Sequence, residues 1–406
     1  MTSISMRTAL VLSTSIAAMG LAMPALAQMT SVTVPGVSLP KVATIPGEVP
    51  IDSGVTTTGT PAATANVVDV ASGTIEQRVA GEEGGAATDA ASLTNSGSTT
   101  IRARATATNA EGQAIANASL VDAIFQNIAG PYTGVSAAFV NSGTLTIAAA
   151  ATATGTTSPG EGDAFGARAV SSAIGGVHQE AVIEGNKTGT TTVTHLNTGT
   201  FAFSSTAIAS AVDSAIATSE MEEAVFMRAQ GNGSGSVTAN TTLTNSGTMT
   251  AASAATATST ARDATAVAGA GGGEHGLIHI RSAVNGTGVD VGNASLINNA
   301  GRSITVSSTA TATAFGAANA TALGGDGFST AEDTKGRVIL VQAQASGSDA
   351  GTANATITNA GTITATFTSR ATSTGPGTAG DGGSAVATTI SNGTIRQIVE
   401  AGGPET

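Results

Sequence analysis

The feature that most constrains this chain is a short corner unit, Asn-x-Gly followed by alternating residues, which returns along its length. Its clearest copy reads LTNSGTMT at residues 243–250. The Asn and Gly of the six copies are Asn95 and Gly97, Asn141 and Gly143, Asn197 and Gly199, Asn245 and Gly247, Asn299 and Gly301, and Asn359 and Gly361. Successive asparagines are 46, 56, 48, 54 and 60 residues apart, with a mean of about 53. A period of this length predicts a stacked repeat architecture.

Each unit has the chemistry of a tight corner followed by a strand. Asn and Gly tolerate the left-handed backbone that a corner needs, and Asn can hydrogen-bond its own backbone. After the corner, apolar residues alternate with small residues, mostly threonine, at period two. This alternation predicts a strand with one buried face. In the fifth copy one extra residue follows Gly301, so Ile304 and Val306 take the inward positions. We expect a β-bulge there, because one inserted residue would otherwise reverse every later side chain.

A second motif lies between the copies of the first. It reads GTIEQRV at residues 73–79 and GTIRQIV at residues 393–399, with weaker relatives at 124–126, 177–179, 225–227, 277–280 and 338–342. These short apolar runs also predict strands. If each repeat makes two coils, six repeats would stack about 12 coils at ~4.8 Å into a rod of roughly 55 to 60 Å.

Residues 1–27 have the organisation of a secretory signal peptide. Arg7 supplies a positive start, residues 9–21 form a short apolar segment, and Ala25-Leu26-Ala27 is a small-x-small cleavage site. A membrane anchor is the alternative, and Pro24 together with the cleavage site argues against it. The sequence therefore predicts export, with a mature chain that begins at Gln28.

The composition limits the kind of core and partner that this chain can have. It has no cysteine and no tryptophan, a single tyrosine, and 52 glycines, so a core must come from small residues stacked in register. The net charge is −12, and the lysines are Lys41, Lys187 and Lys335. An acidic balance of this kind argues against binding to nucleic acid or anionic lipid.

The predicted organisation is a leader or linker at residues 28–64, a β-solenoid at residues 65–399 and a polar tail at residues 400–406. Prolines at 35, 40, 46, 50 and 61 favour an extended leader over a central strand. An all-helical fold is the first alternative, because residues 207–227 are rich in alanine. Disorder is the second, because aromatic residues are scarce. Thr and Gly interrupt the alanine runs, and apolar positions keep a fixed phase to the corners, so we favour an all-β fold.

The signal peptide, the threonine-rich leader and the iterated Asn-Ser-Gly-Thr strands together resemble the passenger of a bacterial autotransporter. The resemblance covers residues 1–399 and implies a right-handed parallel β-helix of about six imperfect repeats on the surface of a Gram-negative cell. Such passengers act in adhesion or as stalks. The resemblance ends before the aromatic-girdled β-barrel translocator of that family, so we expect outer-membrane association only through a missing or separate translocator. A truncated product, a secreted homologue and a protein bound to the surface by other means remain open.

The chain offers few residues for catalysis or metal binding. Glu274, His275 and His279 have a spacing that suggests a metal site on a helix, but a strand is expected there. His178 and His279 fall in a variable slot of the second motif and are expected to face solvent. Acidic Gly-rich turns at residues 160–163, 324–327 and 380–383 lack the nine-residue period of calcium-binding repeats. Arg102 and Arg104 are expected on an outward strand face. We therefore predict no catalytic, metal or cofactor residues and no cofactor.

The function that these observations favour is an exported, non-catalytic spacer or adhesin, at the cell surface, in the medium or in the periplasm. Its ligand would be a surface, a glycan or a protein. A β-helix polysaccharide lyase or hydrolase is the alternative, which needs a pair of carboxylates and usually aromatic sugar platforms. An ice-binding solenoid would need regular threonine rows, and the uneven 46- to 60-residue spacing predicts no such rows.

Overall fold

A computed structural model describes residues 29–34, 37–38, 42–45, 49–58, 65–72, 75–80, 88–110, 112–156, 166–185, 188–271, 276–324, 337–346, 350–375, 384–391 and 394–402. The predicted signal peptide lies outside them. The elements in these residues are strands, and none of these residues belongs to a helix long and apolar enough to cross a membrane.

The chain passes through four all-parallel sheets in turn, which we call A, B, C and D. Sheet A contains β1 (Met29–Val34), β5 (Ala65–Ser72), β9 (Ala114–Val121), β13 (Ala167–Ile174), β17 (Ala215–Glu222), β21 (Ala264–Ala270), β25 (Ala318–Gly324) and β29 (Ala385–Ser391). Sheet B contains β2 (Val37–Ser38), β6 (Ile75–Ala80), β10 (Ile124–Gly130), β14 (Val177–Ile183), β18 (Val225–Gly233), β22 (Ile278–Gly286), β26 (Ile339–Ser346) and β30 (Ile395–Gly402).

Sheets C and D follow in the same order. Sheet C contains β3 (Val42–Ile45), β7 (Thr88–Asn95), β11 (Gly134–Asn141), β15 (Gly189–Asn197), β19 (Val237–Asn245), β23 (Val289–Asn298) and β27 (Ala350–Asn359). Sheet D contains β4 (Val49–Thr58), β8 (Ser98–Thr108), β12 (Thr144–Thr154), β16 (Thr200–Ala211), β20 (Thr248–Ser259), β24 (Ser303–Ala314) and β28 (Thr362–Ser373). Each strand pairs with the strand four places later in the chain, which is the topology of a parallel β-helix.

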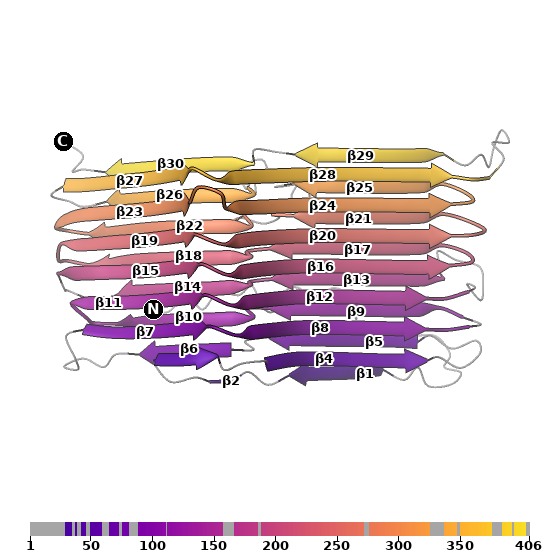
Figure 1. The fold of residues 1–406 in the computed structure, drawn as a ribbon, viewed down its shortest axis with the longest axis horizontal. Helices are drawn as coiled ribbons and strands as arrows, with labels where there is room; N and C mark the ends of the chain where they lie inside the picture. Colours follow the sequence, from indigo (N-terminus) through magenta and orange to yellow (C-terminus); the bar gives the residue numbers. More distant parts are fainter. Residues whose placement is uncertain are drawn as a thin grey trace.

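Each sequence repeat makes one coil of four strands, and not the two coils that were assumed for the rod length. The corner asparagines of successive repeats are direct neighbours, as in the pair Asn197 and Asn245. Eight stacked strands at about 4.8 Å give a height of roughly 34 Å rather than 55 to 60 Å. The longest dimension runs along the strands instead (Figure 1), because sheets C and D continue each other nearly end to end. At about 3.3 Å per residue, residues 237–259 span roughly 70 Å if extended.

The coils form a right-handed, flattened helix with two layers. In Figure 1 strands of sheets C and D run left to right on the near side, and strands of sheets A and B return right to left on the far side. The chain rises from β4 at the bottom to β29 and β30 at the top. Rising while turning in this direction makes a right-handed helix, the hand preferred by parallel crossovers. The predicted all-β, right-handed fold is confirmed.

The stack begins earlier than the boundary at residue 65 that the prolines predict. Residues expected to be a leader form β1 to β4, which pair in register with β5 to β8. Pro50 lies within β4, and β4 is the outermost strand of sheet D. A proline is tolerated there because an edge strand leaves some N–H groups without a partner strand. At the other end, β30 continues to Gly402, past the predicted start of the tail.

The core is divided into two halves with different side chains. Sheets B and C, with the first residues of each sheet D strand, enclose Leu, Ile, Val, Phe and Met side chains. The first residues of the sheet A strands and the later residues of the sheet D strands enclose a second apolar cluster that consists of alanines, among them Ala257, Ala266 and Ala312. Because a methyl group fills so little space, the two layers must approach closely in the alanine half. The same sequence alternation therefore builds two cores of different thickness.

A ladder of buried asparagines joins sheets C and D inside the core. Their side-chain amides hydrogen-bond from coil to coil, with Nδ2–Oδ1 distances of 2.8, 2.8, 2.9, 2.8 and 2.7 Å along Asn95, Asn141, Asn197, Asn245, Asn298 and Asn359. The first five are buried, and Asn359, on the outermost strand of sheet C, is exposed. Each amide also donates to a backbone carbonyl of the next coil, as Asn197 does to Thr248 at 3.2 Å. The corner glycine is required on steric grounds, because a Cβ on Gly199 would collide with the carbonyl oxygen of Gly143.

The fifth corner differs from the prediction. The ladder residue is Asn298, which pairs with Asn245 and Asn359, and the predicted Asn299 is exposed and donates to Ser246 Oγ at 2.7 Å. Residues 299–302 form a longer corner, with Gly301 at φ +72°, and Ile304 is buried as expected. Counted from Asn298 the insertion is even, so the alternation is kept without the bulge that we expected.

Two further polar ladders cross the core. Gln126 donates to Gln77 at 2.6 Å, and Gln179 donates to Gln126 at 2.9 Å. Serines of sheets A and D alternate at the boundary between the two core halves, where Ser205 and Ser219 hydrogen-bond at 3.0 Å. Within each ladder a coil offers its neighbour the same acceptor, which satisfies buried polar groups by repetition. The glutamine ladder ends at Gln179, whose Oε1 is buried without a hydrogen-bond partner because Met227 occupies that position in the next coil.

Candidate functional site

The predicted corner residues are structural rather than a ligand site. Asn95, Asn141, Asn197 and Asn245 are buried in the core ladder, Asn359 is its exposed last member, and Asn299 lies outside it. Gly143, Gly199 and Gly247 each stack on the glycine of the preceding coil. The chemistry available to a ligand therefore lies on the outer faces of the sheets.

The histidines have three different environments. His195 points inward from β15, between Phe139 and Phe201, and is 1% exposed. Burial lowers the pKa of His195 to about 3, and neither ring nitrogen has a hydrogen-bond partner, so its ring is a neutral part of the apolar core. His275 lies outside the described residues, as does Glu274. His178 and His279 point outward from sheet B.

The outward histidines belong to a column of rings on sheet B, and they are not simply solvent-facing as we expected. Phe125, His178, Phe226 and His279 lie on neighbouring strands with ring centroids 4.9, 4.5 and 5.3 Å apart in that order. His279 is only 1% exposed and Phe226 only 6%. The sequence hides this column because its members are about 50 residues apart.

An acidic cluster surrounds His178 at the corner between sheets A and B. Asp122 and Glu223 have φ of +48° and +50°, at the position where the coil between them has Gly175. His178 Nδ1 lies 3.4 Å from Asp122 Oδ1. Burial acts to lower the pKa of His178, but the hydrogen bond to Asp122 and the charges of Asp122, Glu180 and Glu223 outweigh burial, so the pKa is raised. Such strained positions in non-glycine residues are uncommon.

The part of the chain that the structure describes contains no group of three or more His, Asp and Glu side chains able to hold a metal ion. The acidic turns at residues 160–163 and 380–383 lie outside this part, and of the turn at 324–327 only Gly324, the end of β25, falls within it.

The outer side of sheets C and D forms a broad uncharged surface, which we call the C–D face. It consists of the outward side chains of β11, β12, β15, β16, β19, β20, β23, β24, β27 and β28. These strands are described throughout, and Arg370 is their single charged outward side chain. Most of the others are Thr, Ser, Asn or Ala, and many are half-buried by their neighbours. The net charge of the chain is −12, so its acidic residues lie outside the C–D face.

Threonine and serine form regular columns across the C–D face, contrary to our expectation of no rows. One column contains Thr144, Thr200, Thr248, Ser303 and Thr362 in direct register. The loops and corners absorb the differences in repeat length, so the strands remain aligned. Arg102 and Arg104 project from β8 beside this face, as predicted.

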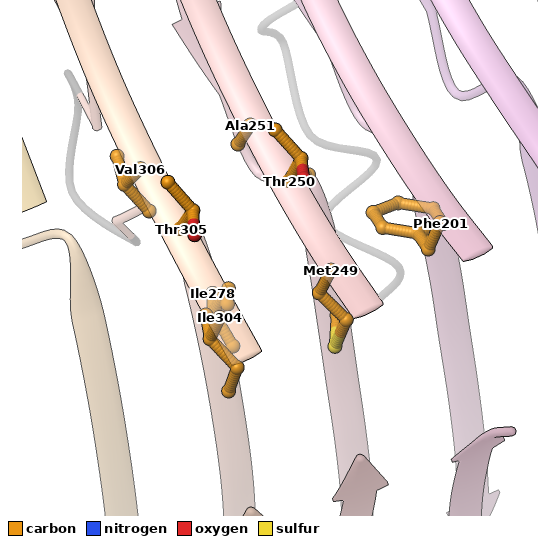
Figure 2. A pocket seen from close by; sticks show the side chains of 9 residues that line it. Phe201, Met249, Thr250, Ala251, Ile278, Ile304, Thr305 and Val306 are labelled. Carbon is orange, nitrogen blue, oxygen red and sulfur yellow. The ribbon is translucent and has the colours of Figure 1, made fainter. Parts of the chain in front are cut away.

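A small apolar hollow lies between sheets B and D. Phe201, Met249, Ala251 and Ile304 border it from sheet D, and Ile278 borders it from sheet B (Figure 2). Ala251 leaves this gap, because its neighbours at the same position are the larger Phe203 and Val306. With no polar side chain aimed into it, the hollow is a packing defect rather than a substrate pocket.

No family model, curated protein or solved structure matches this chain.

Proposed function

We propose that this protein is an exported, non-catalytic β-helix that serves as a spacer or adhesin at the cell surface or in the medium. The observation that carries the proposal is the C–D face. Coil after coil presents the same hydroxyl and amide groups at nearly equal spacing, and Arg370 is the single charged side chain among them. Such a face can make many weak contacts of the same kind, which suits attachment to an extended surface.

The location and family in this proposal come from the sequence. Residues 1–27 have the features of a signal peptide, and the repeat units resemble those of autotransporter passengers. The parallel β-helix is compatible with that family but is shared with others. Fractionation of expressing cells into medium, outer membrane and periplasm tests the location, and recovery in the cytoplasm with Arg7 still present would contradict it.

A β-helix lyase or hydrolase is the second candidate, and the cluster at the A–B corner favours it. Three acidic residues gather there, since Asp122, Glu180 and Glu223 all act on His178. Acid–base chemistry on a polysaccharide uses groups of this kind. Turnover of pectin or another acidic glycan, lost in Asp122→Asn, would replace the adhesin proposal with this one.

The adhesin proposal is tested by placing charge on the C–D face. Thr256 and Thr311 are in-register neighbours on β20 and β24. The double change Thr256→Glu and Thr311→Glu should reduce attachment of the purified mature protein to cells and abiotic surfaces. The matched control is Thr265→Glu with Asn319→Glu, an in-register pair on the outer side of sheet A. Equal attachment by both variants and the parent protein would refute the proposal. If the purified protein inhibits the growth of ice crystals, the ligand of the C–D face is ordered water.

A further inference from the structure

Two arginines lie side by side on the outer face of sheet B, opposite the C–D face. Arg228 on β18 and Arg281 on β22 are in direct register, which places like charges on strands about 4.8 Å apart. Both side chains are half-buried. Like charges at directly opposed positions of a sheet are destabilising unless a counter-charge lies between them.

The nearest carboxylate serves only one of the two. Glu180 Oε1 accepts from Arg228 Nη1 at 3.0 Å, and its other oxygen accepts from Asn127 Nδ2 at 2.8 Å. Glu180 lies on β14, one strand beyond Arg228, so Arg228 separates it from Arg281. Both carboxylate oxygens are therefore already used on the far side of the pair.

Arg281 has no carboxylate within ion-pair distance among the described residues. Its hydrogen bond from Nη2 goes to the neutral Gln344 Oε1 at 3.4 Å. The Nε atoms of Arg228 and Arg281 are buried without a hydrogen-bond partner. Burial first, and the charge of Arg228 second, lower the pKa of Arg281, and Glu400 offsets this in part. A guanidinium has five donors, and among the described residues Arg281 donates one hydrogen bond, to Gln344.

The surroundings of the pair limit the access of water on one side. His279 and Phe226 are nearly buried in the ring column next to the arginines, and Leu340 continues that column at 6% exposed. On the other side lie the amides of Gln230 and Gln344. Charge-assisted hydrogen bonds are stronger in such partly dehydrated positions.

We propose that Arg228 and Arg281 bind one oxyanionic group, a carboxylate or a phosphate, on the outer face of sheet B. Two guanidinium groups in register offer parallel N–H donors to an anion with two or more oxygens. The strongly acidic chain repels polyanions at long range, so the expected ligand carries one such group, for example a uronate residue or a single phosphate ester. This site is independent of the C–D face.

The site is tested by thermal unfolding of the purified mature protein in inorganic phosphate, in glucuronate and in glucose, each at the same ionic strength. Phosphate or glucuronate should raise the Tm in a saturable way, while glucose should not. The arm with the larger shift identifies the source of the oxyanion. Arg281→Gln should abolish the shift, and Arg281→Lys should weaken it by about tenfold in Kd, because lysine keeps the charge but not the paired donors.

The anion-free protein provides a second readout. Arg281→Gln should raise the Tm without ligand, since it removes the repulsion from Arg228, whereas a purely structural arginine would lower it. Arg302→Gln is the control, because Arg302 is exposed in the fifth corner and its change should leave the anion-dependent shift intact. The proposal fails if neither anion shifts the Tm, or if the shift survives in Arg281→Gln.

Discussion

At the scale of single residues, the stack depends on buried side chains that repeat at one position in every coil. Asn197 accepts from Asn141 and donates to Asn245 and to the carbonyl of Thr248. Asn197→Ala interrupts the ladder and leaves buried groups without partners, so it should lower the free energy of unfolding by about 2–4 kcal/mol. Urea denaturation measures this loss.

The control for the ladder is Asn293→Ala. Asn293 belongs to an outer asparagine ladder, where it donates to Asn240 at 2.9 Å and remains half-exposed. Water can replace that hydrogen bond, so the cost should stay below about 1 kcal/mol. Equal losses in the two variants would mean that burial does not determine the strength of the inner ladder.

His195 gives the stability a pH dependence. Its pKa is about 3 in the folded chain against 6.5 without burial, so between these values the unfolded chain binds a proton that the folded chain does not. This contribution to stability is complete above pH 6.5 and is lost as the pH falls toward 3, with a total on the order of 5 kcal/mol.

His195→Leu should remove that dependence, since the neighbouring coil has Leu243 at the same position. The measurement is the urea midpoint from pH 7 to pH 4 in both proteins. The stabilising effect of the substitution should grow as the pH is lowered. A constant difference across this range would show that His195 does not titrate on unfolding.

Most of the individual corner residues could be located from the sequence, but their part in a hydrogen-bonded asparagine ladder could not. It chose Asn299 because the Asn-x-Gly pattern fits that residue, whereas strand pairing selects Asn298, and pairing depends on neighbours about 50 residues away. The glutamines at 77, 126 and 179 were visible in the second motif, yet nothing local distinguishes a buried ladder from an exposed one.

At the scale of the elements, the two core halves should respond oppositely to larger side chains. Ala257 lies in the alanine half, where a bulkier residue must push sheets A and D apart. Ala251 borders the apolar hollow of Figure 2. Ala257→Val should therefore destabilise by about 1–3 kcal/mol, while Ala251→Val should be neutral or stabilise by up to about 1 kcal/mol.

Thermal and urea unfolding of the two valine variants provide the comparison. The two residues lie six positions apart on β20 and both face inward, so strand propensity and side-chain direction are matched. Similar destabilisation in both would mean that the hollow closes in solution or that the alanine half has room to spare.

The strands and their facing followed from period-two alternation, as with buried Met249 and half-buried Thr250. The number of coils did not. A repeat of about 53 residues fits either one coil of four strands or two shorter coils, and the choice depends on which strands pair. Pro50 favoured an extended leader over a strand for a related reason. A proline fits β4 because this strand lies at the edge of the sheet, and the sequence does not show which strand is at the edge.

At the scale of the whole molecule, the sites arise from stacking rather than from local motifs. The ring column of sheet B combines Phe125 and His178, which the chain separates by a full coil. The regular C–D face likewise depends on loops absorbing uneven repeat lengths. The uneven spacing of the repeats along the sequence predicted no regular rows. Sequence distance measures a complete coil with its loops, whereas the rows depend on the step between neighbouring strands.

Because the coils are stacked in register, a deletion should be tolerated only when it removes one complete coil. Ala215 and Ala264 are register partners at the starts of β17 and β21. Removing residues 215–263 joins Ser214 to Ala264 and excises one complete coil, after which β21 can pair with β13 and Asn197 with Asn298. Because each coil contacts mainly its neighbours, the shortened protein should fold cooperatively with a β-rich circular dichroism spectrum.

The matched deletion removes residues 215–264, one residue more. It starts β21 with Thr265, so Thr265 and Val267 turn into the alanine half and the alanines of β21 turn outward. This variant should lose several kcal/mol of stability or fail to fold, and limited proteolysis should cut it much faster than the in-register deletion. If both deletions behave alike, the strands are not held by the register described here, and the repeat would tolerate slippage that the asparagine ladder and the one-coil period both exclude.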